Sequence, residues 1–151
     1  AIAPEDTALS LSGKLAALGA DLLIDTLPDY LSGTVIPQIQ LDEGATYAPL
    51  IEKEAGRLDF TLPAVVLERR VRAYNPWPVA FFEWGEGVLK VFSAHVENTQ
   101  TSTPCSRQIL SGFPAVSTNE GWLVLDEVQP SGKKVMSGKA FLSGARNWLT
   151  A

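Results

Sequence analysis

The stretch Arg72-Ala73-Tyr74-Asn75-Pro76-Trp77-Pro78 decides how the second half of this chain folds. A helix-like run at residues 62–71 precedes it, and a hydrophobic strand-like run at residues 79–84 follows it. Proline has no backbone N–H and restricts the residue before it to extended conformations, so the helix must end near Tyr74. We therefore predict a corner of extended backbone between a helix and a sheet. Trp77 is interpreted as its buried anchor, because large aromatic side chains usually pack inside.

Short strand-like runs follow this corner at residues 79–84, 88–96, 107–110, 114–117 and 122–128. Turn sequences such as Gly85-Glu86-Gly87 and Asn119-Glu120-Gly121 separate them. This spacing is typical of a small β-barrel or sandwich. The helix before the corner has Thr61 as its expected cap and Pro63 in its first turn. Residues 137–149 are expected to form a short closing helix.

The first third of the chain is rich in leucine and has helical spacing. Thr7 is an expected N-cap, Gly19 is expected to break or bend the helix, and a second helical run at residues 22–31 contains Pro28. Ser32-Gly33 ends that run, and residues 34–45 have the composition of a connector. Helices with no sheet of their own to pack on are better explained as the end of a larger upstream domain.

The composition indicates a globular protein. Of its 151 residues, 46% are hydrophobic and 19% charged, which is enough for one sizeable core. A single cysteine cannot form an internal disulfide, which fits a reducing compartment. No apolar run approaches the roughly 20 residues that a membrane span needs, and no signal peptide is recognised.

The net charge of −5 argues against a generally nucleic-acid-binding surface, but its distribution is uneven. Residues 1–45 hold one basic and seven acidic side chains, whereas residues 46–151 hold 11 basic and 10 acidic ones. A balanced domain can still present a basic stripe if its acidic residues face elsewhere. Its binding to RNA would be weaker and less salt-dependent than that of a strongly basic domain.

Four segments, in order, resemble methionyl-tRNA formyltransferases. Residues 67–78 (Leu-Glu-Arg-Arg-Val-Arg-Ala-Tyr-Asn-Pro-Trp-Pro) are similar to the start of that family's C-terminal domain. Residues 44–60 resemble the segment that joins its two domains, and residues 129–137 (Gln-Pro-Ser-Gly-Lys-Lys-Val-Met-Ser) resemble its near-terminal run. Residues 6–19 look like the last helical part of its catalytic domain. The resemblance covers nearly the whole chain.

The resemblance implies a fold that is mainly β with flanking helices. Residues 1–33 would be the end of a Rossmann-like catalytic domain, residues 34–45 a linker, and residues 46–151 an oligonucleotide-binding-like barrel. The family transfers a formyl group from 10-formyltetrahydrofolate to the amino group of initiator methionyl-tRNA. Its catalytic Asn, His and Asp, near a His-x-Ser-Leu-Leu-Pro segment, have no counterpart in this sequence. This chain is therefore expected to bind tRNA beside an upstream catalytic domain, without catalytic residues or a cofactor of its own.

Candidate tRNA-binding residues follow from charge and position, because ammonium and guanidinium groups contact phosphates without reading sequence. They are Lys53, Arg57, Arg69, Arg70, Arg72, Lys133 and Lys134. Each charge could instead be solvated or paired within the protein, and Glu68 lies one helical turn before Arg72. Trp77 could stack on a base, but an anchor in the core or between domains is the favoured interpretation.

Other chemistry is poorly supported. His95 lies in a strand-like run with no obvious partner, and Cys105 lies in a loop with no histidine nearby. Neither residue has the spacing of a metal site or of a catalytic thiolate.

Two alternative functions stay open. A related formyltransferase could act on a nucleotide sugar or on the folate itself, although the Asn-Pro-Trp-Pro and Lys-Lys-Val-Met-Ser matches favour the tRNA enzyme. A stand-alone barrel could instead be a binding module without catalysis, which the acidic balance favours and the helical residues 1–33 oppose. For the favoured function we expect the bacterial cytoplasm or an organelle as location, and no DNA or membrane partner.

Overall fold

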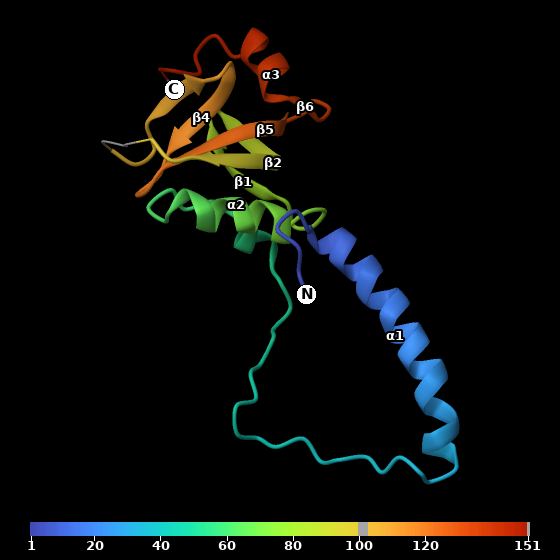
Figure 1. Ribbon diagram of the computed structural model, residues 1–151. Coiled ribbons are helices and arrows are strands. Elements are labelled where there is room, and N and C mark those ends of the chain that lie inside the picture. The colour runs from blue at the N-terminus through green and yellow to red at the C-terminus, as the bar shows by residue number, and fades with distance from the viewer. Residues whose placement is uncertain (100–102, 151) are drawn as a thin grey trace.

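The computed structural model describes residues 1–99 and 103–150 (Figure 1). Within them a six-stranded antiparallel sheet has the order β1-β2-β5-β4-β3, and β6 pairs with β5. The helices are α1 (Ala8–Leu31), α2 (Ala64–Ala73) and α3 (Gly138–Gly144), and a 3₁₀ turn spans Lys53–Gly56. The strands are β1 (Ala80–Trp84), β2 (Gly87–Glu97), β3 (Arg107–Leu110), β4 (Phe113–Ser117), β5 (Trp122–Pro130) and β6 (Met136–Ser137).

The predicted fold class is confirmed: the chain is mainly β, with α2 on one side of the barrel-like sheet and α3 on another (Figure 1). All five predicted strands are present. The sixth, β6, was not predicted, because its two residues are strand only through their pairing with β5. Over residues 1–99 and 103–150, no helix is both long enough and apolar enough to cross a lipid bilayer.

The core lies between the inner face of the sheet and the two helices that cover it. α2 contributes Leu67 and Val71, which are fully buried, and β5 contributes Leu123 and Leu125. Each such side chain stabilises the fold by about 1.5–3 kcal/mol on burial. Further along the chain, Trp148 packs edge-on against Phe141 of α3, and its indole N–H donates to the Gln108 carbonyl at 2.8 Å.

Close packing of α3 on the sheet depends on a glycine at its start. A Cβ atom at Gly138 would lie 2.1 Å from the carbonyl oxygen of Leu125 and 2.8 Å from Cδ of Pro114. Both distances are below any normal contact, so only glycine lets this helix approach β4 and β5 so closely.

The start of α2 differs from the prediction. Its N-cap is Pro63, which offers no side-chain hydrogen bond. Thr61 was expected to cap the helix, but its hydroxyl and N–H both donate to Asp59, at 2.7 and 3.0 Å. The free N–H of Ala64 is instead satisfied by the Glu120 carbonyl at 2.9 Å. A tertiary contact thus replaces the local cap.

The predicted break at Gly19 is wrong, because α1 is one continuous helix that includes both Gly19 and Pro28. Thr7 is its N-cap as predicted, in a capping box with Ser10. A glycine inside a helix costs only about 1 kcal/mol, which the surrounding helix-forming residues can offset. None of the residues of α1 is buried. Figure 1 shows α1 reaching away from the barrel and residues 34–52 returning without helix or strand.

Candidate nucleic-acid interface

The Asn75-Pro76-Trp77-Pro78 corner is a tight turn between α2 and β1. The Asn75–Pro76 and Trp77–Pro78 peptide bonds are both cis. The Asn75 amide donates to the Phe92 carbonyl at 3.0 Å and so ties the turn to β2. Trp77 is 58% exposed. The Val79 N–H donates to the Tyr74 carbonyl at 2.9 Å and closes the corner. A hydrogen-bonded turn thus stands where extended backbone was predicted, and the prediction of a buried Trp77 is wrong because the indole lies at the surface.

The arginines of α2 have different surroundings. Leu67 and Val71 face the core, whereas Arg69 is exposed and makes no ion pair with any residue in 1–99 or 103–150. Arg70 is half-buried beside Asp59. Hydrogen bonds from Thr61 lower the pKa of Asp59 below its ordinary 3.8, and the charge of Arg70 adds a smaller effect.

Arg72 connects α2 to the start of α1. Its Nε donates to Glu68 at 2.5 Å and its Nη2 donates to the same carboxylate at 3.2 Å, so the predicted pair one helical turn apart is confirmed. Its Nη1 donates to the Asp6 carbonyl at 2.8 Å. The bond to Glu68 raises the pKa of Arg72. With these donors engaged, Arg72 has less capacity left for a phosphate than Arg69.

Arg57 is also engaged. It pairs with Glu83 of β1 and with Glu54 at 3.2 Å, and its guanidinium lies 5.4 Å from the centre of the Phe81 ring. The bond to Glu83 raises the pKa of Arg57. About half of the side chain stays exposed, so a phosphate could reach Arg57 only in competition with two carboxylates.

Lys133 and Lys134 lie at the tip of the loop between β5 and β6, and both are exposed. The Gln129 amide donates to the Lys133 carbonyl at 2.9 Å and fixes the loop. Lys90 of β2 is exposed beside Gln129, its partner in the strand register, and lines a cavity of about 260 Å³ with Gly132. We call Lys90, Lys133 and Lys134 the lysine cluster. Among the described residues none of the three is in an ion pair.

The predicted candidates thus fall into two groups. Lys53, Arg69, Lys133 and Lys134 are exposed, and the described part of the chain offers them no carboxylate partner. Arg57 and Arg72 are held by carboxylates, and Arg70 lies beside one. Sequence reasoning missed Lys90. Its neighbours Leu89 and Val91 are buried, and strand alternation places Lys90 on the other, exposed face of β2.

Sequence reasoning also missed the partner of His95. Nδ1 of His95 lies 2.9 and 3.0 Å from the two carboxylate oxygens of Asp126, on the diagonal between β2 and β5. Cys105 lies in a loop, as predicted, and its thiol is free. Within residues 1–99 and 103–150, no three His, Cys, Asp or Glu side chains gather as a metal site would require.

Comparison with known proteins decides the family. The family model "Formyl transferase, C-terminal domain" matches residues 50–146. The chain belongs to this family. It is 48% identical to a methionyl-tRNA formyltransferase of Myxococcus xanthus, over 95% of this chain and 46% of that protein. It is 37% identical to a methionyl-tRNA formyltransferase of Pseudoalteromonas translucida, over 99% of this chain and 48% of that protein.

Solved structures share the fold of this chain. HypX from Aquifex aeolicus matches with a TM-score of 0.62 at 17% identity, over 82% of this chain and 22% of that one. The structure of HypX with tetrahydrofolic acid gives the same TM-score and identity, over 87% of this chain and 23% of that one. At this identity the likeness establishes the fold alone. The chain spans about half the length of the curated relatives it matches.

Proposed function

We propose that this chain is the C-terminal half of a methionyl-tRNA formyltransferase and that its barrel-like domain holds initiator methionyl-tRNA. The identity to two such enzymes over almost the whole chain supports this proposal. The upstream half of the polypeptide would bind 10-formyltetrahydrofolate as co-substrate and transfer its formyl group to the methionyl amine. This chain would contribute binding and no catalytic residue, in the bacterial cytoplasm or in an organelle.

The observation that carries the tRNA-binding role is the set of exposed cations without a carboxylate partner. An ammonium or guanidinium group that is already paired must break that pair to hold a phosphate, whereas an unpaired one loses only bound water. Lys133, Lys134 and Arg69 meet this condition, and Lys90 extends the lysine cluster. Lys53 lies in the segment that leads into the barrel, while Arg57, Arg70 and Arg72 would act as secondary contacts.

The proposal assigns residues 1–33 to the end of the upstream catalytic domain and residues 34–45 to the linker. Supporting this, α1 exposes leucines along its whole length, among them Leu15, Leu18 and Leu22. Covering such side chains stabilises a helix by about 1.5–3 kcal/mol each, and an uncovered helix is marginal in water. The upstream half of the polypeptide is the neighbour that would cover them.

The test is binding of labelled initiator methionyl-tRNA to the polypeptide that contains this chain and its upstream half. We expect salt-sensitive binding that weakens when Lys133 and Lys134 are replaced by alanine. Absence of binding at low salt would overturn the proposal. Formylation of a nucleotide sugar or a folate without tRNA binding would indicate a related transferase, and a native product near 16.3 kDa would indicate a stand-alone module.

A further inference from the structure

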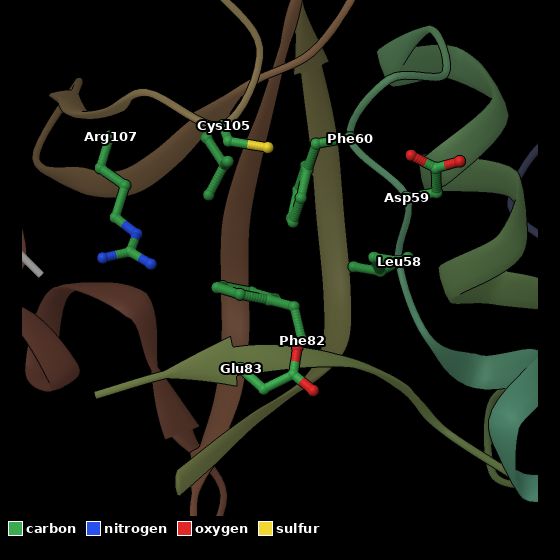
Figure 2. Close-up of a pocket in the computed structure, with 8 residues that line it drawn as sticks. Leu58, Asp59, Phe60, Phe82, Glu83, Cys105 and Arg107 are labelled. Atoms are coloured by element: carbon green, nitrogen blue, oxygen red, sulfur yellow. The ribbon is translucent and has the colours of Figure 1, made fainter. Parts of the chain in front are cut away.

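A second candidate site lies away from the lysine cluster. An open cavity of about 280 Å³ lies between the segment before α2, the strand β1 and the start of β3. Figure 2 shows the residues that line it. Its walls include the rings of Phe60 and Phe82, which meet edge to face at 5.2 Å. Arg107 and Cys105 enter from the opposite side. Of the candidate tRNA contacts, none lines this cavity.

Arg107 is the unusual group in this cavity. Its Nη1 is buried and has no hydrogen-bond partner, and its guanidinium carbon lies 5.4 Å from the centre of the Trp148 ring. Burial lowers the pKa of Arg107. Figure 2 shows the guanidinium reaching from β3 into the cavity. Nη1 is closed to solvent, whereas Nε and Nη2 are not fully buried and also have no hydrogen-bond partner among the described residues. An acceptor supplied from outside would gain strong hydrogen bonds from these two donors.

The two carboxylates that line the cavity already have partners. Asp59 accepts two hydrogen bonds from Thr61, and its lowered pKa keeps it ionised at neutral pH. Glu83 is ionised and paired with Arg57. Arg70 lies beside Asp59, so both carboxylates already have a cation near them, and Arg107 is the charged group of the cavity without a hydrogen-bond partner in the described part of the chain. A flat ring with hydrogen-bond acceptors fits this site, because it can lie against the phenylalanines and accept from Arg107.

We propose that this cavity takes one guanine base from a single-stranded segment of the bound RNA, with Arg107 donating to O6 and N7. Guanine presents these two acceptors side by side, and the guanidinium fork matches them in a bidentate pair. RNA-binding proteins read unstacked bases in this way, through aromatic walls and base-edge hydrogen bonds. The inference rests on the proposed function, because it takes RNA as the ligand.

Cys105 gives the experiment a reporter inside the site. It is the single cysteine of the chain, is exposed, and lines the cavity, so a bound base should shield its thiol from iodoacetamide. The probes are the RNA tetranucleotides UUGU, UUAU and UUUU and inorganic phosphate, added to the 151-residue chain. We expect saturating UUGU to slow alkylation about tenfold. Binding should weaken about tenfold in Arg107→Met, because a bidentate pair to guanine is lost.

Two further variants separate recognition from folding. Arg107→Lys keeps the positive charge but lacks the fork, so it should lose the preference for UUGU over UUAU while melting like the wild type. Arg146→Met, at an exposed arginine that does not line the cavity, should behave like the wild type. Equal protection by all three oligonucleotides, protection by phosphate, or no protection would each overturn the guanine site.

The proposed function is tested separately with initiator tRNA and the longer polypeptide. Binding of tRNA without protection by UUGU would remove the guanine site and leave the tRNA-binding role intact. Protection by UUGU without tRNA binding would overturn the tRNA-binding role and leave the guanine site intact.

Discussion

Replacing Lys133 and Lys134 together by alanine should flatten the salt dependence of tRNA binding by an amount that the structure sets. Both side chains are exposed and, within the described residues, neither is in an ion pair, so each can contribute a full phosphate contact. Each such contact adds about 0.7–0.9 to the slope of log K against log salt concentration. The double variant should therefore have a slope smaller by about 1.4–1.8. Between about 50 and 200 mM salt, the wild type should lose about tenfold more affinity than the variant.

The measurement is fluorescence anisotropy of labelled initiator tRNA across a salt series, with the longer polypeptide. Arg57→Ala is the matched control, because Arg57 is exposed but already paired with Glu54 and Glu83. The salt slope of Arg57→Ala should differ from that of the wild type by less than the change expected for the loss of one unpaired lysine. The reasoning is refuted if the lysine variant keeps the wild-type slope, or if Arg57→Ala changes the slope as much as the two lysines do.

Three further predictions concern stability. Gly138→Ala should lower the free energy of unfolding in urea by about 1–3 kcal/mol or more, because its Cβ would meet a carbonyl oxygen at 2.1 Å. Gly144→Ala, with open space around it, should stay within about 1 kcal/mol of the wild type. Trp148→Phe should cost about 1–3 kcal/mol more than Trp84→Phe in thermal unfolding, because Trp148 loses a hydrogen bond and Trp84 has a buried N–H without a partner. Asp6→Asn should speed amide hydrogen exchange at the start of α1 at pH 7. This effect should fade below about pH 4, because the hydrogen bond from Lys14, with those from Ala3 and Ser10, lowers the pKa of Asp6 below the ordinary 3.8 and protonation of the carboxylate weakens these bonds.

The sheet could be predicted from the sequence because its strands carry their own signals. Strands β1, β2 and β5 contain several valine or aromatic residues, and each of the five longer strands has a glycine-containing turn beside it. The start of α2 and the strand β6 depend instead on tertiary contacts. Ala64 bonds to the distant Glu120 carbonyl, and Met136 pairs with β5. Local propensity cannot indicate either contact, since each needs the finished fold.

In the candidate site, too, local contacts could be predicted from the sequence and long-range contacts could not. Glu68 and Arg72 were predicted as a pair because one helical turn brings them together whatever the fold. The pair of Arg57 with Glu83 and that of His95 with Asp126 join positions 26 and 31 residues apart. An isolated bridge between Arg57 and Phe81 sets the first distance, and the register of β2 and β5 sets the second. The exposure of Lys133 could be anticipated because its loop is a local feature of the sequence. The unpartnered Nη1 of Arg107 could not be anticipated, because it depends on how the finished fold packs.

The acidic net charge is compatible with an RNA-binding surface once the charges are placed in space. The acidic residues Asp21, Asp25 and Asp29 lie in the later part of α1, which reaches away from the barrel (Figure 1). Asp21 is about 20 Å along the helix from its first residue, at a rise of about 1.5 Å per residue. Charges in water are largely screened beyond about 8–10 Å at physiological salt. A phosphate approaching the lysine cluster therefore responds to the unpaired lysines nearby, and the sum over the chain does not predict its binding.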